Sequence, residues 1–463
     1  MKFADGFANL AARLGFGTNK LFSASRYAFD FFTRNTTELE AAYRTNWIVG
    51  QIVDVVAEDM TRAGIEFGAG LAPDESQRMS QAMQRLQIFD ALCEAVKWSR
   101  LYGGALAVLL FDGDDMATPL DVSSIGPGRF RGLLVLDRWQ VEPSLSDVVT
   151  EYGPEFGKPR LYTVSDAGLG GTFAGARIHH SRVLRFEGIP LPYRQRVSEQ
   201  GWGESVIERL RDRLTAYDSA SQGTAQLVYK AHLRTYKVKG LREILASGGP
   251  AYEGLIKQLA SIRDFQSNEG LTLADVEDEF QVNDYSFGGL ADVLAEFGQQ
   301  LSGATGIPLV RLFGQSPRGF STGDTDLRNY YDMIRSKQAK DLDDAVRRVL
   351  AVLCMSELAR PLPDGFSFAF ASLWQVSDDQ KAAIAVQDAN RVAALVNADI
   401  FDRGQALEEL RQCGPISGRY TVITDAAVTL AELEPPKAEL DAMVHRMPPL
   451  SGKDKAQDGA ADG

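Results

Sequence analysis

Apolar residues recur at three- and four-residue spacing in several long stretches of the chain, which predicts amphipathic helices. The first strong pattern covers residues 45–67. A second runs from about Asp74 to Leu101, and the longest runs from about Asp324 to Leu358. Further helices are expected at 204–232, 286–305 and within about 378–412.

Residues 104–188 have a different pattern, because short β-rich runs there are separated by Gly, Pro and Asp. Such runs predict a mostly antiparallel sheet. Residues 233–284 are predicted to form a small mixed unit between the helical patterns 204–232 and 286–305. If those two helices run antiparallel, the small unit projects from the body at the end of a two-helix stalk.

Composition and charge limit the classes of function. Hydrophobic residues make up 44% of the chain and charged residues 24%, which is typical of a soluble folded protein. No window approaches the roughly eighteen uncharged apolar residues of a membrane span, and Asp5 and Arg13 interrupt any N-terminal signal. The net charge of −13 argues against a protein that wraps DNA, yet it suits a like-charged wall past which DNA slides.

The stretch RLFGQSPRGFSTGD, residues 311–324, lies between an apolar run and the longest helical pattern. Gly314 and Gly319 have the spacing of a phosphate-binding loop, but Phe320 and Ser321 occupy the positions that require Lys and Ser or Thr. Nucleotide binding is therefore not expected here. The glycines predict a movable loop, and Asp324 is placed to cap the helix that follows.

A carboxylate cluster follows the first predicted strand. Asp112, Asp114 and Asp115 lie close together, but Ala117 and Ser123 stand where a calcium-binding loop needs Gly and Glu. We therefore interpret this segment as an Asp-rich turn.

Histidines and cysteines provide no familiar site. His179 and His180 are adjacent on a predicted strand, so their side chains are expected on opposite faces and unable to bind one metal together. Cys93, Cys354 and Cys413 lie far apart and are expected to be free thiols in a reducing compartment. The sequence therefore predicts no catalytic residues, no metal, no cofactor and no enzymatic activity.

The run SGATGIPLVRLFGQSPRGFSTGDTDLRNYYDMIRSKQ, residues 302–338, resembles tailed-bacteriophage portal proteins. YRTNWIVGQIVDVVAEDMTRAGIEF, YGGALAVLL, LLVLDRWQVEP and IHHSRVLRFEG fit the same family in order, so that the resemblance covers about residues 40–400. The branch in question was once a domain of unknown function and was later named after an anti-CBASS phosphodiesterase.

The resemblance implies an α+β portal fold, mainly helical with antiparallel β segments. Carried over by position, its parts are a wing, a two-helix stem, a clip, a tunnel loop and a crown. These parts would be an N-terminal arm (1–40), the wing (41–203), stem helix 1 (204–232), the clip (233–284), stem helix 2 (285–305), further wing (306–375) with the tunnel loop (about 313–325) and its long helix, the crown (376–434) and a disordered tail (435–463).

The resemblance also implies a function. Portal proteins form a ring, usually a dodecamer, at one capsid vertex of the virion, and double-stranded DNA passes through its channel during genome packaging and ejection. The implied partners are the terminase large subunit and the head-completion or adaptor protein, both at the clip, and the major capsid or scaffold protein. The implied location is the portal vertex, with the host cytoplasm during assembly and no membrane.

The resemblance places seven residues near DNA in the tunnel loop: Arg311, Gln315, Ser316, Arg318, Phe320, Ser321 and Thr322. Arg311 has two interpretations, since it either contacts phosphates transiently or pairs with a neighbouring carboxylate. The mixed charges at 204–214 also have two interpretations, namely ion pairs between subunits or ordinary solvation of a helix.

An alternative function follows from the family's name, namely a nucleotide-processing phosphodiesterase of the anti-CBASS type. That enzyme class, as the resemblance implies it, uses two His-x-Thr/Ser motifs. His179-His180-Ser181 fits one of them, whereas the segments after His232 and His445 do not. A single histidine of the required pair does not make up the mechanism.

Overall fold

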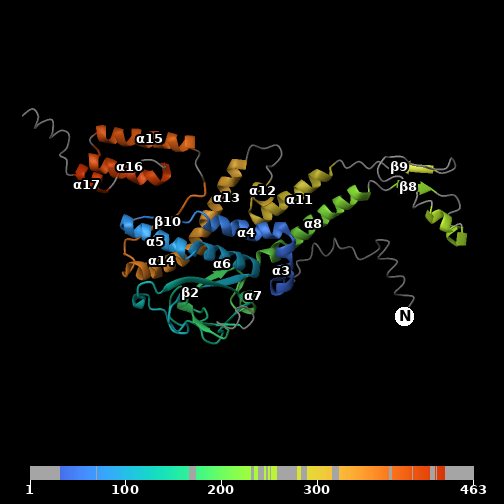
Figure 1. The fold of residues 1–463 in the computed structure, drawn as a ribbon, viewed down its shortest axis with the longest axis horizontal. Coiled ribbons are helices and arrows are strands. Elements are labelled where there is room, and N and C mark those ends of the chain that lie inside the picture. Colours follow the sequence, from blue (N-terminus) through green and yellow to red (C-terminus); the bar gives the residue numbers. More distant parts are fainter. Residues whose placement is uncertain are drawn as a thin grey trace, which may run out of the picture. The chain divides into compact units, whose positions relative to one another are not determined.

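The structure, a computed structural model, describes the following residues: 32–68, 70–165, 174–230, 234–237, 244–246, 249–250, 252–257, 279–282, 289–314, 323–374, 378–398, 400–417, 423 and 425–432. The chain forms two compact units, Met1–Leu373 (unit 1) and Trp374–Gly463 (unit 2). Each is described by itself below, and Figure 1 shows the elements of both.

Unit 1 begins with a short 3-10 turn, η1 (Phe32–Arg34), and four helices. These are α3 (Thr36–Thr45), α4 (Trp47–Thr61), α5 (Pro73–Arg85) and α6 (Ile88–Tyr102). Asn46 separates α3 from α4: its backbone amide donates to the carbonyl of Ala42 at the end of α3, and its side chain accepts from the amides of Ile48 and Val49 at the start of α4. Phe32 and Leu39 are buried, so the end of the segment expected to be a loose arm, 1–40, is packed into the core.

Two predicted helices are shorter than expected. The pattern at 45–67 ends as a helix at Thr61, and Ile65–Phe67 forms β1, which pairs with β10 (Phe368–Phe370). The pattern at 74–101 is broken at Gln87, whose φ of 50° is left-handed and separates α5 from α6. Local periodicity did not predict these breaks. Pairing with β10 outweighs helix propensity at Ile65–Phe67, and apolar spacing alone does not reveal a single left-handed residue such as Gln87.

The β-rich segment forms two three-stranded antiparallel sheets. One has the order β3 (Phe130–Asp137), β2 (Gly104–Phe111), β7 (Val183–Glu187), and the other β4 (Val141–Pro143), β5 (Leu161–Val164), β6 (Arg177–His179). Two 3-10 turns, η2 (Val122–Ser124) and η3 (His180–Arg182), lie between strands, and the short helix α7 (Tyr193–Ser198) follows β7. The predicted antiparallel pairing is confirmed, in two sheets rather than one.

The two sheets share a small apolar core that is separate from the helical core. One face of β2 supplies Leu106 and Val108, and the second sheet supplies Tyr162, Val164 and Ile178, around the buried Trp202. The other face of β2 packs into the main core with α4, α6 and α14. The alternation of side chains along β2 therefore joins two cores through one strand.

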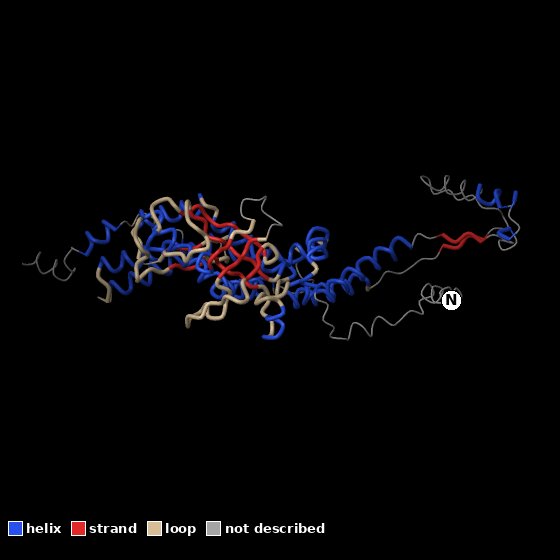
Figure 2. Tube along the Cα trace, turned by 90° about the horizontal axis from the view of Figure 1, so that it is seen from below, coloured by secondary structure: helices blue, strands red, loops and turns tan. Residues whose placement is uncertain are grey.

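Two long helices follow the sheets, α8 (Val206–Lys230) and α11 (Leu290–Thr305). They pack side by side and run in opposite directions (Figures 1 and 2). Between them in sequence, β8 (Arg234–Lys237) pairs with β9 (Glu279–Val282).

The end of unit 1 contains α12 (Leu309–Phe313), α13 (Gly323–Lys337) and α14 (Asp343–Leu358). The single helix expected at 324–358 is two helices joined by a π-helical turn, Gln338–Leu342. In that turn Gln338 is buried, and its side chain donates to the carbonyl of Met60 at 2.8 Å. The helices α13 and α14 are therefore separated by one turn that is wider than an α-helical turn.

The described residues of unit 2 form the helices α15 (Asp378–Asn397), α16 (Arg403–Ser417) and α17 (Asp425–Glu432). Arg391 of α15 pairs with Glu409 of α16 at 3.0 Å. In the part of the chain that the structure describes, no helix combines the length and apolar content needed to cross a membrane.

Three glycines allow the backbone to cross itself beside the first sheet. A Cβ added to Gly203 would lie 2.6 Å from the carbonyl oxygen of Ile189 and 2.9 Å from the carbonyl carbon of Gly188. The amides of Gly188 and Gly203 both donate to the carbonyl of Gly103 at 3.0 Å. Any side chain at Gly203 would force these segments apart.

We expect Gly203→Ala to lower the free energy of unfolding by roughly 1–3 kcal/mol, because the new methyl group meets backbone atoms that cannot move independently. Denaturant titration measures the change. Gly153→Ala is the matched control, since an added Cβ there meets nothing within 4 Å, and it should change little. Equal midpoints for both variants would contradict the close packing.

Candidate functional site

A buried carboxylate lies at the base of the loop that joins α12 to α13. Asp59 of α4 is fully buried and accepts from Arg311 Nη2 at 2.7 Å and 2.8 Å, one distance to each carboxylate oxygen. Tyr330 Oη donates to the same carboxylate at 2.8 Å, and Arg62 Nε lies 2.8 Å from it. We call Asp59, Arg62, Arg311 and Tyr330 the Asp59 cluster.

The Asp59 cluster fixes both sides of the loop to one helix. Arg311 belongs to α12 before the loop, whereas Tyr330 belongs to α13 after it. Burial and then the Asp59 carboxylate raise the pKa of Tyr330, so its hydroxyl stays protonated and continues to donate. The cluster thereby holds α12 and α13, the two helices that the loop joins, to α4.

The structure places one of the seven predicted loop residues. Arg311 makes the ion pair with a carboxylate that the sequence left open, and its side chain remains 32% exposed. Gln315, Ser316, Arg318, Phe320, Ser321 and Thr322 lie outside the described residues. The structure therefore describes the support of the loop and not its tip.

Sequence reasoning missed Asp59 and Tyr330 as members of a site. A signal existed for Asp59, because it falls on the same face of α4 as the apolar residues Val55, Val56 and Met60, whereas its neighbour Glu58 is exposed. A fully buried carboxylate requires a charged or hydrogen-bonding partner. The identity of the partner was not predictable, since Arg311 is 252 residues away in sequence.

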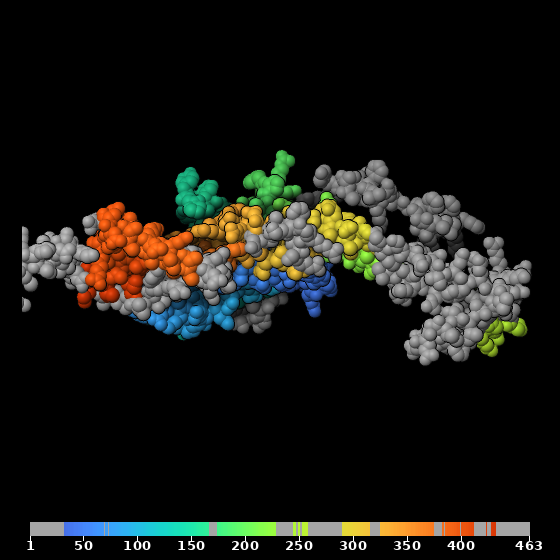
Figure 3. Space-filling view, turned by 90° about the horizontal axis from the view of Figure 1, so that it is seen from above, coloured from blue at the N-terminus to red at the C-terminus, as the bar shows by residue number. Residues whose placement is uncertain are grey.

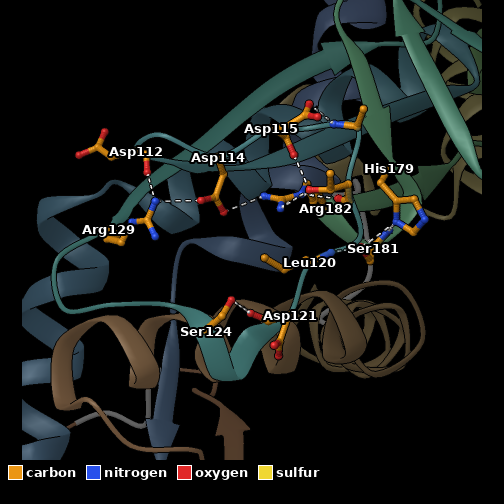
Figure 4. A network of polar contacts seen from close by, with 12 residues as sticks. Asp112, Asp114, Asp115, Leu120, Asp121, Ser124, Arg129, His179, Ser181 and Arg182 are labelled. Atoms are coloured by element: carbon orange, nitrogen blue, oxygen red, sulfur yellow. Dashed lines mark hydrogen bonds and ion pairs between the residues drawn. The ribbon is translucent and has the colours of Figure 1, made fainter.

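The carboxylates after β2 lie in turns and are held by ion pairs and hydrogen bonds, as Figure 4 shows. Asp114 lies between two guanidiniums, at 2.8 Å from Arg129 Nη2 and 3.2 Å from Arg182 Nη1. Asp115 Oδ1 accepts from the amide of Ala117 at 3.0 Å, as in an Asp-initiated turn. The interpretation of this segment as an Asp-rich turn is confirmed.

The expected placement of His179 and His180 is wrong. Their ring centroids are 4.4 Å apart, because β6 ends at His179 and His180 already belongs to η3. His179 Nδ1 accepts from the amide of Ser181 at 3.2 Å and lies 2.9 Å from Ser181 Oγ, which itself accepts from the amide of Leu120 at 2.7 Å. His179 and Ser181 thus hold the turn together. Burial lowers the pKa of the His179 ring and of the His180 ring.

Charged side chains near the start of α8 form ion pairs and hydrogen bonds with other residues of the same chain. Arg209 pairs with Glu204 at 2.8 Å, and Arg211 lies 3.4 Å from Glu38 of α3. Glu208 accepts from the Thr33 amide at 2.9 Å. These contacts attach η1 and α3 to α8, a role that neither interpretation of the sequence included.

The free thiols are confirmed for Cys93 and Cys354. Burial raises the pKa of both, which makes them poor nucleophiles at neutral pH. The side chain of Cys413 lies outside the described residues.

We expect Arg311→Ala to lower the free energy of unfolding by roughly 3 kcal/mol, because it leaves the buried Asp59 carboxylate without its bidentate partner. Arg131→Ala is the control. It breaks an ion pair with Asp112 in which the two side chains are 61% and 55% exposed, so it should change the stability little. Thermal and denaturant unfolding measure both changes, and equal losses would argue against the role of the Asp59 cluster.

Comparison with solved structures supports the fold. The chain is similar to a chain in the neck of an empty GTA particle computed with C6 symmetry, with a TM-score of 0.50 and 14% identity. The similarity covers 81% of this chain and 93% of that one. At this identity the comparison shows the fold alone, and the predicted α+β fold with antiparallel β segments is confirmed.

Three relatives share 29% identity with the chain. One is an uncharacterized protein of Haemophilus influenzae, matched over 89% of this chain and 91% of its own length. The other two carry the name Anti-CBASS protein Acb1, from Caulobacter sp. and Sphingomonas paeninsulae. They match 85% and 82% of this chain, which spans 63% and 60% of their lengths.

These names correct one expectation from the sequence. We expected no enzymatic activity, but two relatives bear the name that the family resemblance linked to a phosphodiesterase. The prediction of no activity is therefore contradicted. The match to these two relatives extends over most of this chain.

The family itself follows from a match to a family model. The family model described as "Phage portal protein" matches residues 37–394, which is well over half of the chain. This range includes the Asp59 cluster, both sheets and the two long helices α8 and α11. The chain belongs to the phage portal protein family.

Proposed function

We propose that the chain forms a ring at one vertex of a phage capsid, with twelve copies as is usual for portal rings. The ring would be the channel for genome packaging and ejection, so that the protein would be part of the virion. The single observation that carries this proposal is the family match over residues 37–394.

We assign the parts of the ring by position. The wing would include 41–203 and 306–375, the stem 204–232 and 285–305, the clip 233–284 and the crown 376–434. Two observations support the assignment: α8 and α11 are long, adjacent and antiparallel, and the strands β8 and β9 between them pair with one another. A helix pair that ends in a small paired unit suits a stem that presents its tip to other proteins.

The proposed clip is the docking platform for the terminase large subunit and later for the head-completion protein. Residues 1–40 and the wing are the proposed contacts with the capsid or scaffold protein. Assembly would take place in the host cytoplasm.

The loop at about 313–325 is the proposed tunnel loop. The Asp59 cluster supports this proposal because it anchors the helices on both sides of the loop to α4. Repeated around a ring, such anchored loops would surround DNA in a channel of an acidic protein, whose charge of −13 per chain keeps the DNA from adhering.

We expect the purified chain to form a species of roughly 600 kDa, about twelve times its 50.7 kDa. Light scattering after size exclusion measures this mass, and negative-stain electron microscopy shows whether the species is a ring. A chain that remains monomeric both alone and when expressed with its capsid and scaffold proteins would refute the proposal.

We expect Arg318→Ala to reduce the yield of DNA-filled particles without stopping ring assembly, because it removes a cation from the proposed DNA-facing loop. Arg318→Lys is the control, since it keeps a positive charge at the same position and should fill normally. DNA content per particle is the measurement, and normal filling in the Arg318→Ala variant would count against a role of this arginine with DNA.

A second candidate function, phosphodiesterase activity on nucleotides, is favoured by the name of the two Acb1 relatives. Incubation of the purified chain with cyclic dinucleotides, followed by chromatography, tests it. Linear products that are absent with the His179→Ala variant support the activity, and intact substrate at high protein concentration counts against it.

A further inference from the structure

Two projections leave unit 1 on one side, as Figure 3 shows in teal and green. The first, residues 148–159, is closed by the bridge between Val148 and Pro159. At its tip Tyr152 is 96% exposed and stacks on Phe156, with ring centroids 5.5 Å apart. Exposed, preorganised aromatic side chains of this kind are the residues that anchor protein–protein interfaces.

The second projection, residues 190–201, contains α7. Its Tyr193 is 82% exposed and its Val197 60%. The bridge between Ile189 and Glu204 closes its base. Two apolar tips therefore extend from the same side of unit 1 (Figure 3).

A groove of about 700 Å³ lies beside the bases of both projections, and it is lined by residues of each. Among its lining side chains are eight Lys or Arg and only four Asp or Glu, in a chain whose overall charge is −13. We call it the basic groove. Its walls include Lys158 and Arg196 of the two projections, and Lys337 and Lys340 at the π-helical turn.

Part of the positive charge in the basic groove has no acidic counterpart among the described residues. Arg348 donates to the carbonyls of Val183 and Ser181, at 3.0 Å and 2.8 Å, and no carboxylate of the described residues forms an ion pair with it. Carbonyl partners satisfy hydrogen bonds but leave the charge itself unmatched, so the groove attracts an anionic partner.

The opposite side of unit 1 has the reverse charge. Figure 3 shows the blue and light-blue helices there, away from the two projections. Asp54 and Glu58 of α4 and Asp90 and Glu94 of α6 form an acidic ridge, with Lys97 as its cation at 2.8 Å from Glu58 and 3.3 Å from Asp54. Asp90 and Glu94 are exposed and lie one helical turn apart.

We propose that the basic groove and its two projections receive the acidic ridge of the next copy of the chain. This inference rests on the proposed ring, in which each subunit uses two different faces, one for each neighbour. Opposite faces with opposite charge and apolar tips on one of them meet that requirement. The contact would also offset the repulsion between copies that each carry a charge of −13.

Charge reversal tests the contact. Lys158→Glu/Lys340→Glu alters the groove, and Asp90→Lys/Glu94→Lys alters the ridge. We expect each pair alone to raise the protein concentration at half-assembly by about tenfold or more, and the two pairs together to restore most of the loss. Sedimentation velocity at several salt concentrations measures assembly, and salt should weaken the wild-type ring.

Two further variants keep the test decisive. Tyr152→Ser removes an aromatic tip without changing charge and should also weaken assembly, whereas Asp364→Lys alters an exposed loop outside both faces and should not. Unchanged thermal unfolding confirms that the variants are folded. Reversal pairs that assemble like wild type, or a combination no better than either pair, would overturn the contact alone, while a wild-type chain that never assembles would overturn the ring as well.

Discussion

The arrangement of unit 1 around its long helices depends on one buried charge, the Asp59 carboxylate. Removing such a group from water is costly, and the cost is offset only if partners surround it. Here the partners are Arg311 of α12, Tyr330 of α13 and Arg62 at the end of α4, so that α12 and α13 must both reach the end of α4, more than 250 residues away in sequence. The Asp59 cluster therefore fixes the positions of α12 and α13, the two helices between which residues 315–322 run.

The β-rich part of unit 1 is organised differently, by close approach of backbones rather than by charge. Gly103, Gly188 and Gly203 allow the chain after β7 to return against the start of β2. Trp202 then fills the small core between the sheets. Since β2 belongs to both cores, displacement at this crossing would be felt by the helices as well.

Much of this fold was predictable from apolar periodicity. The helices α4, α8, α11 and α14 and the antiparallel strands of 104–188 lie where the pattern indicates, since each buries a continuous apolar face. The pairing of β1 with β10 was not predictable, because it joins segments about 300 residues apart and depends on tertiary contacts. His179 and His180 were misplaced because one residue at a strand end decides on which side a ring lies.

The candidate site was predictable only in part. The loop was recognised from its glycines and from its resemblance to portal proteins, and a carboxylate partner for Arg311 was one of two interpretations. The identity of that partner required the structure, because the spacing of charges along a sequence says little about which helices meet.

The π-helical turn at Gln338–Leu342 has a geometric consequence. A helix advances by about 100° per residue, so one additional residue in a turn changes the direction in which all later side chains point. Tyr330 and Ile334 can then face α4 while Val346, Val349 and Leu353 face a different part of the core, all on a nearly continuous rod. The π-helical turn rotates the buried face of α14 relative to that of α13. The two helices can therefore pack against two surfaces that one regular helix could not face at once.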